Sequence, residues 1–553
     1  MKILIIGAVA AGTSAAAKSR RNDETAEIKI FETDSDISYS ACGLPYYIGN
    51  EVRKREDLVP RDSGFFKRKY NVDILTRQQV LKINPKSKSL LVKNLATSEE
   101  YIENYDKLVI STGARPFLPE IPGVNKKNVF VLRNVESADK IKNYIAKFKP
   151  KKALVIGSGF IGLEILDNFK ALGMDVSLVE KEEHLMKNLD ADVASYLKEI
   201  LDKSDVKVYL NNFVSELEGS KDFARRARLK NGTEIETDIV IVGAGIRADV
   251  SLAKEAGIEI GLTGAIKVNK KMETNLKDIY ACGDCAESYS LITGRDIYRP
   301  LGSTANKMGR IAGDSMTGGN LEFKGILGTG IFKIFDFTVA QTGLTEKEAI
   351  TEGYDVAVSH IIKPDSQVYY RGEEMMIKAV ADKKTMKLLG AQIIGKAGVD
   401  KRIDVFATAL TFGARVQDLF HLDLAYAPPF STTKDPVMYT GMVLTNETER
   451  NRKLITSELL EEKLEKGEKV NIIDVRTQKQ YVQGHIRNAV NIPLEVFRGS
   501  IEKMDKDAQI VLYCNTGVSG NAAQNILINN GFKFAYNLSG GYKNYIRVKS
   551  DLI

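Results

Sequence analysis

Cysteine is the residue type here with the most chemistry to offer, and it occurs only four times among 553 residues. Four thiols in so long a chain cannot form a disulfide framework, so we expect reduced thiols in a cytoplasmic protein. Cys282 and Cys285 make a C-x-x-C pair, which by itself suggests a redox pair or half of a metal site. Neither a second C-x-x-C nor a nearby histidine completes a zinc site, so we expect no metal.

A glycine-rich loop follows the apolar run KILII at residues 2–6. This order predicts a strand, a tight turn and a helix whose N-terminus faces a pyrophosphate. Gly7 and Gly12 fill the turn and helix-packing positions, whereas Val9 stands at the middle position, which is usually glycine. Glu32 ends the next apolar run, where an acid typically binds the adenosine ribose. An ordinary α/β turn without a cofactor is the alternative interpretation.

A second loop of the same kind appears in KKALVIGSGFIGLEI, with Gly157, Gly159 and Gly162 in a full G-x-G-x-x-G pattern. Its acid is Glu180, and a carboxylate there favours NADH over NADPH, although Lys181 beside it weakens that preference. Two such loops in one chain predict two dinucleotides. Passing a hydride from a nicotinamide to a flavin requires such a pair.

The composition limits the class of protein. Hydrophobic residues make up 43% and charged residues 27%, as in ordinary soluble globular proteins. The net charge of +7 is spread over the chain without a Lys and Arg run, so we expect no nucleic-acid partner. The apolar stretch at residues 2–6 reads as a strand instead of a signal peptide, and we expect no membrane span. The length predicts roughly three or four domains.

Three short motifs around the loops carry a resemblance. LVISTGARP contains Thr112 and Gly113, TDIVIVGAGIRADV follows the second loop, and DIYACGDCAE contains Asp284. With these motifs the chain resembles the two-dinucleotide-binding flavoprotein disulfide reductases over residues 1–320. The resemblance implies FAD and NADH or NADPH as cofactors, with Asp284 on the flavin's ribityl hydroxyls and Cys282 and Cys285 as packing residues. It implies cofactor contacts at Gly7, Ala8, Val9, Gly12, Glu32, Thr112, Gly113, Gly157, Gly159, Phe160, Ile161, Gly162, Glu180, Gly243, Gly245, Asp284 and Ala286.

Within that family Cys42, in ISYSACGLPYYIGN, falls where the redox cysteine lies against the flavin. The second cysteine of the glutathione reductase branch would come five residues later, and Tyr47 stands there. A lone thiol can still accept electrons when its partner sulfur comes from outside, as a mixed disulfide, a persulfide or a sulfenic acid. A buried structural cysteine is the alternative interpretation.

Single-cysteine members divide into peroxide or oxygen reductases and coenzyme A disulfide reductases. The former resemble G-x-x-H-G-G, and here Ala10 replaces the histidine. GAVAAG and CGLPYY look instead like the coenzyme A disulfide reductases, although Ala41 replaces an expected asparagine. The resemblance implies substrate contacts at Ser38 and Ala41, and coenzyme A phosphates on a helix face. Ser14, Lys18 and Arg21 have four- and three-residue spacings, so they share one helix face. The alternative interpretation is a face that is simply solvated.

Two further modules follow. Residues 323–445 resemble the family's dimerisation domain, which implies a homodimer in which a phenol of Tyr369, Tyr370 or Tyr426 donates a proton to a leaving thiolate. The polar NETERNRK reads as a linker. Beyond it VNIIDVR, GHIRNAVNIP, IVLYCNTG and LSGGY are similar in order to a rhodanese domain, with Cys514 at the sulfur-carrying position.

Loop amides and the positive end of the next helix can stabilise a thiolate or persulfide at Cys514. Asn515 and Val518 stand where rhodanese loops often have arginines, which weakens binding of a small anion such as thiosulfate. A neutral or larger sulfur donor stays compatible with this loop. An inert, decayed site is the alternative.

Together these patterns predict an α/β chain with two Rossmann-like dinucleotide-binding domains, an α+β dimerisation domain and an α/β rhodanese domain. We expect an FAD-dependent reductase of coenzyme A disulfide, coenzyme A persulfide or polysulfide that uses NAD(P)H and Cys42. The rival functions are an NADH oxidase or peroxidase, and a sulfur-carrier or redox-sensing flavoprotein with little turnover. The expected boundaries are FAD-binding at 1–114 and 246–322, NAD(P)-binding at 115–245, dimerisation at 323–445, a linker at 446–453 and rhodanese at 454–553.

Overall fold

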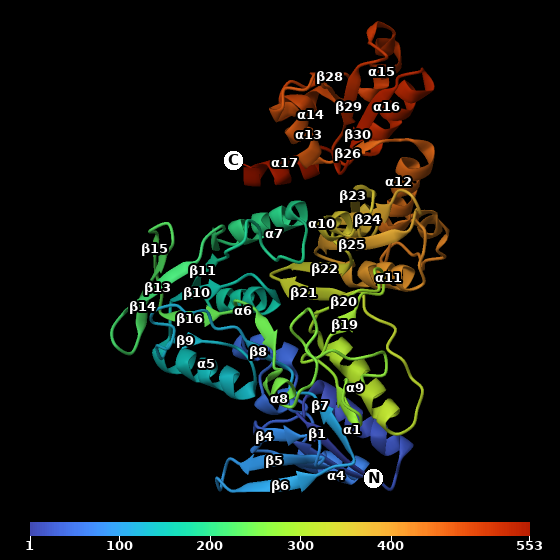
Figure 1. Cartoon of the computed structure of the whole chain (residues 1–553). Coiled ribbons are helices and arrows are strands. Elements are labelled where there is room, and N and C mark those ends of the chain that lie inside the picture. Colours follow the sequence, from blue (N-terminus) through green and yellow to red (C-terminus); the bar gives the residue numbers. More distant parts are fainter. Residues whose placement is uncertain (553) are drawn as a thin grey trace. The chain divides into compact units, whose positions relative to one another are not determined.

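The computed structural model describes residues 1–552, with side chains described up to residue 549. The chain forms two compact units (Figure 1). The first comprises Met1–Lys181 and Asp205–Gly328, and the second comprises Glu182–Ser204 and the chain from Thr329 on. Among the described residues, no helix combines the length and the apolar character needed to span a membrane.

A parallel sheet forms the centre of the first unit, with its strands in the order β18-β7-β1-β2-β3. Ile3 and Ile5 of β1 stand opposite Ile28 and Ile30 of β2, and all four are buried. Such continuous β-branched runs suit strands covered on both faces. The strands are β1 (Lys2–Ile6), β2 (Glu27–Phe31), β3 (Asp73–Leu75), β7 (Lys107–Ile110) and β18 (Ile279–Ala281).

Two long helices pack closely beside this sheet, α1 (Ala10–Asn22) and α9 (Gly302–Met316). Glycines on α9 make the approach possible. A Cβ atom on Gly309 would lie 2.2 Å from the carbonyl oxygen of Ala11, and one on Gly313 would lie 2.4 Å from that of Ala15. Larger residues would therefore push the helices apart.

A second parallel sheet has the order β12-β11-β10-β16-β9 and carries the second glycine-rich loop. Its strands are β9 (Val129–Phe130), β10 (Lys152–Ile156), β11 (Asp175–Val179), β12 (Lys207–Tyr209) and β16 (Ile239–Val242), with helices α5 (Val135–Phe148) and α6 (Phe160–Ala171). Two antiparallel three-stranded sheets also belong to the first unit. They are β4 (Gln78–Asn84), β5 (Ser89–Asn94) and β6 (Glu100–Asn104), and β13 (Val214–Gly219), β14 (Ala224–Leu229) and β15 (Glu234–Glu236).

Shorter elements connect these sheets within the first unit. They are η1 (Ala41–Gly43), α2 (Leu44–Ile48), α3 (Arg55–Leu58), α4 (Ser63–Tyr70), β8 (Ala114–Pro116), β17 (Ile246–Ala248), α8 (Ser251–Glu255), β19 (Ser288–Tyr289) and β20 (Asp296–Ile297).

The second unit begins with an antiparallel sheet in the order β21-β22-β25-β24-β23. Helix α7 (Ala191–Lys203) follows β11 in sequence but belongs to this unit. Lys378 donates to both carboxylate oxygens of Asp192 at 2.9 Å, and Gln392 bonds Asp190. The other elements are β21 (Gly330–Ile334), β22 (Phe337–Gly343), β23 (Val356–Pro364), β24 (Glu374–Asp382), β25 (Leu388–Gly395), α10 (Glu346–Thr351), η2 (Val368–Tyr370), α11 (Val399–Thr411), η3 (Val416–His421) and α12 (Pro436–Arg450).

A parallel sheet in the order β26-β30-β29-β27-β28 follows in the same unit. Its core includes Phe497, Leu512 and Leu527, which are fully buried. Its elements are β26 (Leu454–Ile455), α13 (Ser457–Glu465), β27 (Asn471–Asp474), α14 (Gln478–Val482), β28 (Val490–Asn491), α15 (Leu494–Ser500), η4 (Ile501–Lys503), β29 (Gln509–Tyr513), α16 (Val518–Asn529), β30 (Phe534–Leu538) and α17 (Gly541–Leu552). The parallel and antiparallel sheets confirm the predicted α/β fold class.

The stretch expected to be a linker, residues 446–453, is partly helical. Residues 446–450 are the end of α12. Glu447 accepts a hydrogen bond from the amide of Leu454, and Arg452 donates to the side chain of Asn525 at 2.7 Å. Polar composition does not distinguish a free connection from a helix end whose side chains bond the next domain.

Candidate active site

The first glycine-rich loop joins β1 to α1. Gly7 has φ +103°, and a Cβ there would lie 2.3 Å from the carbonyl oxygen of Ser111. A Cβ on Gly12 would lie 1.9 Å from the carbonyl oxygen of Gly7. Backbone geometry therefore demands glycine at both places. Glu32 accepts a hydrogen bond from the amide of Ala8 at 2.7 Å, which ties the acid to the loop.

The second loop repeats this geometry between β10 and α6. Gly157 has φ +98°, and a Cβ on Gly162 would lie 2.1 Å from the carbonyl oxygen of Gly157. Glu180 accepts a hydrogen bond from the amide of Ser158 at 2.8 Å. Glu32 accepts one from the amide of Ala8 in the same way in the first loop. A Cβ on the middle glycine, Gly159, would meet no protein atom within 4 Å. The protein itself does not require glycine at that position, which explains why the first loop can have Val9 there.

The residues present fit a bound flavin. Asp284 is partly buried, and withdrawal from water raises the pKa of its carboxyl while Arg133 opposes that rise. Within residues 1–549 no hydrogen-bond donor of the protein reaches that carboxylate, whereas the Asp284 carbonyl accepts from Tyr298 at 2.8 Å. A partly buried carboxylate without a protein donor suits the hydroxyl groups of a ligand. Gly113 and Gly245, two other expected cofactor contacts, have positive φ.

Cys42 lies in η1, directly before α2, and is exposed. The amide of Gly43 donates to the carbonyl of Ser40, and the amide of Ser40 donates to that of Leu58, so the turn is fixed from both sides. Tyr47, which occupies the place of a resolving cysteine, donates its hydroxyl to Asp139 at 3.0 Å. The segment therefore presents one thiol.

Glu164 is a site residue that the sequence reasoning missed. It stands on α6, two positions after Gly162, and accepts a hydrogen bond from the hydroxyl of Tyr46 at 3.0 Å. Burial raises the pKa of Glu164 to about 7. Cys42 is exposed, but protein atoms beside its thiol shield part of it from water, which raises its pKa, and the negative charges of Glu164 and Asp284 add to that rise. The only sequence signal was an acid on the helix that follows the second loop.

We expect Glu164→Gln to make Cys42 more reactive above neutral pH. Glu164 is mostly ionised at pH 8, so removing its charge lowers the Cys42 pKa and speeds alkylation of the reduced holoenzyme by about two- to threefold. At pH 6 Glu164 is mostly protonated, and the two proteins should react alike. Iodoacetamide labelling followed by peptide mass spectrometry measures this, with the exposed Glu100→Gln on β6 as the control. Equal rates at both pH values would contradict the electrostatic coupling.

The residues expected to contact coenzyme A lie near the first loop, and they differ in how far their side chains are already engaged by other protein groups. Lys18 is paired with Asp314 at 2.9 Å and donates to Asn22 at 2.8 Å, so much of its charge is compensated. Ser14 bonds Asn306 across to α9. Arg21 is exposed, with its guanidinium 5.4 Å from the ring centre of Tyr70. Ser38 and Ala41 belong to the same unit, and the amide of Ser38 donates to the carbonyl of Ala8 at 2.9 Å.

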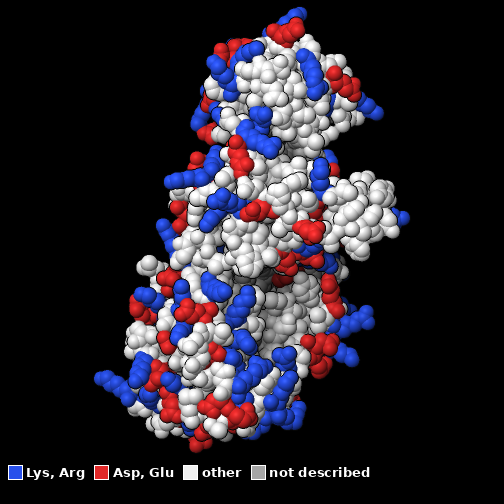
Figure 2. Space-filling view, turned by 90° about the vertical axis from the view of Figure 1, so that its right-hand side faces the viewer, with Lys and Arg blue, Asp and Glu red and all other residues white. Residues whose placement is uncertain are grey.

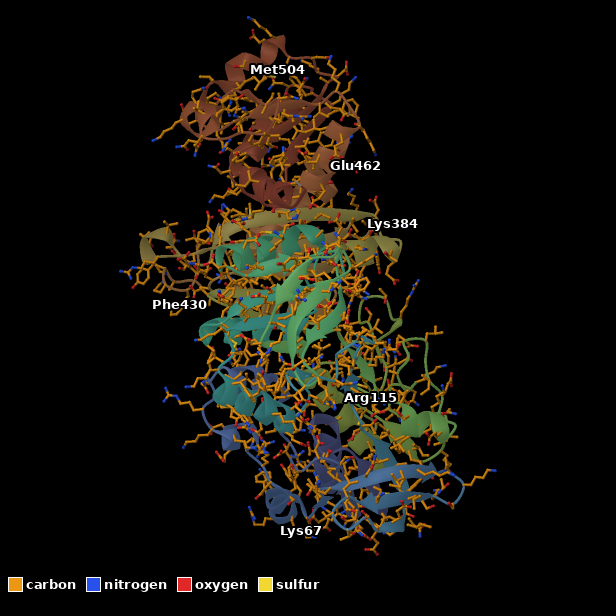
Figure 3. All side chains as sticks on the ribbon, turned by 90° about the vertical axis from the view of Figure 1, so that its left-hand side faces the viewer. Lys67, Arg115, Lys384, Phe430, Glu462 and Met504 are labelled. Atoms are coloured by element: carbon orange, nitrogen blue, oxygen red, sulfur yellow. The ribbon has the colours of Figure 1, made fainter. Side chains whose placement is uncertain are left out.

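The three tyrosines come together in the second unit. The side chain of Gln367 donates to the hydroxyl of Tyr426 at 3.5 Å, and the rings of Tyr369 and Tyr370 meet edge to face at 6.4 Å. All three are exposed, at 74% for Tyr369, 56% for Tyr370 and 46% for Tyr426. Phe430, labelled in Figure 3, lines one pocket together with Tyr426 and is 68% exposed. These aromatic side chains form a surface suited to contact with another chain.

Cys514 follows β29 and precedes α16, and only 6% of its surface is exposed. Gly517 has φ +89° and is the N-cap of α16. The carbonyl of Cys514 accepts from the amide of Tyr542 at 2.8 Å. Strand, cysteine and helix are thus arranged as the sequence predicted.

Cys282 and Cys285 are completely buried. The Cys285 thiol donates to the carbonyls of Ile110 and Cys282 at 3.4 Å, and burial raises its pKa to about 11. Neither thiol is poised to react, because a thiol so far from ionisation is a poor nucleophile.

Figure 2 shows Lys and Arg interspersed with Asp and Glu over the surface in view, without a single basic stripe.

Comparisons with known proteins agree with this arrangement. The family model described as pyridine nucleotide-disulphide oxidoreductase matches residues 1–299, its dimerisation domain matches residues 330–436, and a rhodanese-like domain matches residues 456–547. A coenzyme A disulfide reductase of Staphylococcus haemolyticus is 36% identical over 442 residues, which cover 80% of this chain and 98% of that protein.

Two solved structures span nearly the whole chain. Reduced Bacillus anthracis CoADR-RHD is 38% identical with a TM-score of 0.96, covering 100% of this chain and 98% of that one. A NAD-dependent persulfide reductase from A. fulgidus is 36% identical with a TM-score of 0.91, and the match covers 99% of this chain and 100% of that chain. The chain therefore belongs to the pyridine nucleotide-disulphide oxidoreductase family and carries a rhodanese-like domain after its dimerisation domain, as the sequence motifs indicated.

Proposed function

We propose that this protein uses NADH or NADPH to reduce coenzyme A disulfide, coenzyme A persulfide or polysulfide at Cys42. The observation that carries the proposal is the single exposed thiol of the η1 turn, with Tyr47 in place of a resolving cysteine. The other two cysteines of the first unit are fully buried. The second sulfur must therefore come from the substrate. The names of the similar proteins support the same substrate class.

The proposed cofactor contacts follow from the two loops. The first loop with Glu32 and Asp284 would hold FAD, and the second with Glu180 would hold the nicotinamide nucleotide. The carboxylate of Glu180 at the end of β11 supports NADH. A bound flavin would supply two electrons, taken from NAD(P)H as a hydride, to the sulfur at Cys42.

Cys42 acts as a thiolate nucleophile in the proposed reaction. It attacks one sulfur of coenzyme A disulfide, the original S–S bond breaks, and one coenzyme A thiolate leaves as a mixed disulfide forms at Cys42. With NAD(P)H and one proton, each turnover gives two molecules of coenzyme A thiol from the disulfide. A coenzyme A persulfide gives one coenzyme A thiol and one hydrogen sulfide by the same balance.

The leaving thiolate needs a proton. We propose that a homodimer brings Tyr369, Tyr370 and Tyr426 of one subunit to the thiol site of its partner, where a phenol donates that proton. Their exposure and their position in the dimerisation domain support this role.

A side-by-side assay tests the substrate class. Anaerobic NADH consumption is measured with coenzyme A disulfide, coenzyme A persulfide and hydrogen peroxide at equal concentrations. Faster turnover with a sulfur substrate supports the proposal, and faster turnover with peroxide points to the peroxidase alternative. Stopped-flow mixing with NADH separates both from a sulfur carrier, which should not reduce its flavin quickly.

Arg21→Ala should raise the KM for coenzyme A substrates by about tenfold and leave kcat unchanged. Lys18 is already paired with Asp314, so Arg21 is the more available cation for a phosphate on this helix face. The KM for small inorganic polysulfide should hardly change. Steady-state kinetics with both substrates measure this, with the exposed Arg68→Ala of α4 as control. An equal loss with both substrates would indicate damaged folding instead of a lost phosphate contact.

A further inference from the structure

The first turn of α17 holds the backbone of the Cys514 loop. The amide of Tyr542 donates to the carbonyl of Cys514 at 2.8 Å, and the amide of Lys543 donates to the carbonyl of Asn515 at 3.1 Å. The first amides of a helix have no partner within the helix, so they can bind such carbonyls. The approach is close, because a Cβ on Gly541 would lie 2.4 Å from the carbonyl oxygen of Cys514. The start of α17 therefore fixes two consecutive peptide groups of the loop.

Fixing these two carbonyls also fixes the direction of two loop amides. A trans peptide group is planar, and its N–H points away from its C=O. Both peptide groups are trans, so the amides of Asn515 and Thr516 point away from α17. Within residues 1–549 no protein group accepts a hydrogen bond from either amide. They are free to donate to an anion bound in the loop.

The dimerisation domain, which belongs to the same compact unit, holds the residues just before α17. The amide of His360 on β23 donates to the hydroxyl oxygen of Ser539 at 2.7 Å, and the Nδ1 atom of His360 lies 3.0 Å from the same oxygen. A Cβ on Gly540 would lie 3.0 Å from the Cβ of His360. Lys543 adds an ion pair with Glu374 of β24 at 2.6 Å. The start of α17 is thus fixed to the antiparallel sheet.

The side chain of His360 is itself fixed by a buried carboxylate. Its Nε2 atom lies 2.5 Å from Asp192 of α7, and Lys378 donates to both oxygens of Asp192 at 2.9 Å. Burial acts to raise the pKa of Asp192, but Lys378 and His360 hold it below its usual value. Asp192 is therefore ionised and can only accept, so the Nε2 atom of His360 carries a hydrogen. The ring cannot turn without losing a buried hydrogen bond.

Helix α17 is held at a second point, where it packs beside α7 (Figure 1). Arg547 of α17 pairs with Glu199 of α7 at 3.2 Å, and its guanidinium lies 3.8 Å from the ring centre of Tyr196. Two separate points on and before α17 are therefore bound by residues outside the rhodanese-like domain. These contacts set where the first turn of the helix meets the Cys514 loop.

We propose that His360 is a positioning residue for sulfur transfer at Cys514. Through Ser539 it places the first turn of α17, and the amides of that turn orient the Cys514 loop. The loop, residues 514–520, contains no charged residue of its own, so its shape depends on such hydrogen bonds. The dimerisation domain thereby controls the geometry of a site in the rhodanese-like domain. The inference rests on the proposed sulfur-carrying function of Cys514.

The transfer that this geometry would serve is balanced without an added oxidant or reductant. The Cys514 thiolate attacks the outer sulfur of an organic persulfide, R–S–SH. The bond between the two donor sulfurs breaks, R–S⁻ leaves, and a persulfide forms on Cys514. The loop amides stabilise the anion before and after the step. His360 acts only through the placement of the loop and transfers no proton.

The test compares amide hydrogen exchange with sulfur loading in the full-length reduced holoenzyme. Ser539→Ala removes the oxygen that His360 contacts, and His360→Gln keeps an amide group for Asp192 but lacks the ring nitrogen that faces Ser539. Ser457→Ala is the matched control, because the Ser457 hydroxyl is buried in the same domain and has no hydrogen-bond partner within residues 1–549. Peptide mass spectrometry follows both deuterium uptake and the sulfur added to Cys514 by coenzyme A persulfide without NADH.

We expect Ser539→Ala and His360→Gln to speed exchange of the Tyr542 and Lys543 amides by about tenfold, because their hydrogen bonds to the loop open more often. Loading of Cys514 at saturating donor should slow by about fivefold, while the donor concentration for half-maximal rate stays within about twofold. Exchange in β29 and reduction of coenzyme A disulfide at Cys42 should not change. Ser457→Ala should match wild type throughout.

Three results would overturn the positioning role. They are unchanged exchange of the Tyr542 and Lys543 amides in both variants, an equal acceleration over the whole rhodanese-like domain, and faster exchange with unchanged loading. Exchange is measured without a donor, so it reports on the placement of the loop alone. If wild type itself never loads sulfur, the carrier function fails, whereas selective exchange would still show that His360 holds the loop.

Discussion

Replacing the Cys42 thiol should abolish sulfur reduction while leaving the flavin half of the enzyme intact. We expect Cys42→Ser to lower turnover with coenzyme A disulfide and coenzyme A persulfide by about 10³-fold or more, since a hydroxyl cannot form the mixed disulfide. FAD content and flavin reduction by NADH should stay within about twofold of wild type. The reason is structural, because both loops are built from residues other than Cys42.

The measurement combines stopped-flow flavin bleaching with steady-state NADH consumption for each sulfur substrate. Ser35→Ala, an exposed serine in the connection between β2 and η1, serves as the control and should keep full activity. If Cys42→Ser turned over coenzyme A disulfide at the wild-type rate, the thiol assignment would be wrong. If flavin reduction were lost as well, the variant would report on folding or cofactor binding instead.

Local backbone rules explain why the nucleotide loops could be predicted from sequence. Gly7 and Gly157 are required by positive φ and by the close approach of carbonyl oxygens, and Gly12 and Gly162 are required by that close approach alone. These constraints act within a few residues, so they leave a pattern in the sequence. The imperfect first loop could still be recognised because Glu32 comes directly after the next strand.

Features that depend on distant partners were not predictable in this way. Glu164 became a site residue only because α6 carries it to Tyr46, which lies 118 positions away in sequence. The range expected for the NAD(P)-binding domain, 115–245, includes α7, yet Asp190 and Asp192 bond residues of the antiparallel sheet. A buried ion pair of this kind leaves no periodic signal in either segment.

The expected linker shows the same limit. Its polar composition was interpreted as a linker, whereas residues 446–450 continue α12 and Glu447 accepts a hydrogen bond from the amide of Leu454. Composition reports solvent exposure and says little about whether a segment is ordered. The rhodanese-like domain is held to the rest of its unit by contacts well beyond this connection, including Lys543 with Glu374. That finding changes what a cut in the connection is expected to do.

Cys514→Ser should divide the substrates into two groups. Cys42 and Cys514 lie in different compact units, and the Cys514 domain has no dinucleotide loop. Reduction of free coenzyme A disulfide should therefore stay within about twofold of wild type. Donors that must first load Cys514 should react at least about 10²-fold more slowly, because a serine hydroxyl cannot accept the sulfur as a persulfide. NADH consumption and sulfide release with each donor measure the difference.

A split protein, cut between Asn451 and Arg452, adds a second measure of delivery. The pairs of Ser539 with His360 and of Lys543 with Glu374 should keep the pieces together at high concentration, so activity is retained there. On dilution the pieces separate, and only the donors that load Cys514 should lose rate. Selective loss in both Cys514→Ser and the diluted split protein supports delivery from Cys514 to Cys42. If intact, substituted and split proteins behave alike with every donor, Cys514 has no part in delivery, and the rhodanese-like domain must serve a separate reaction.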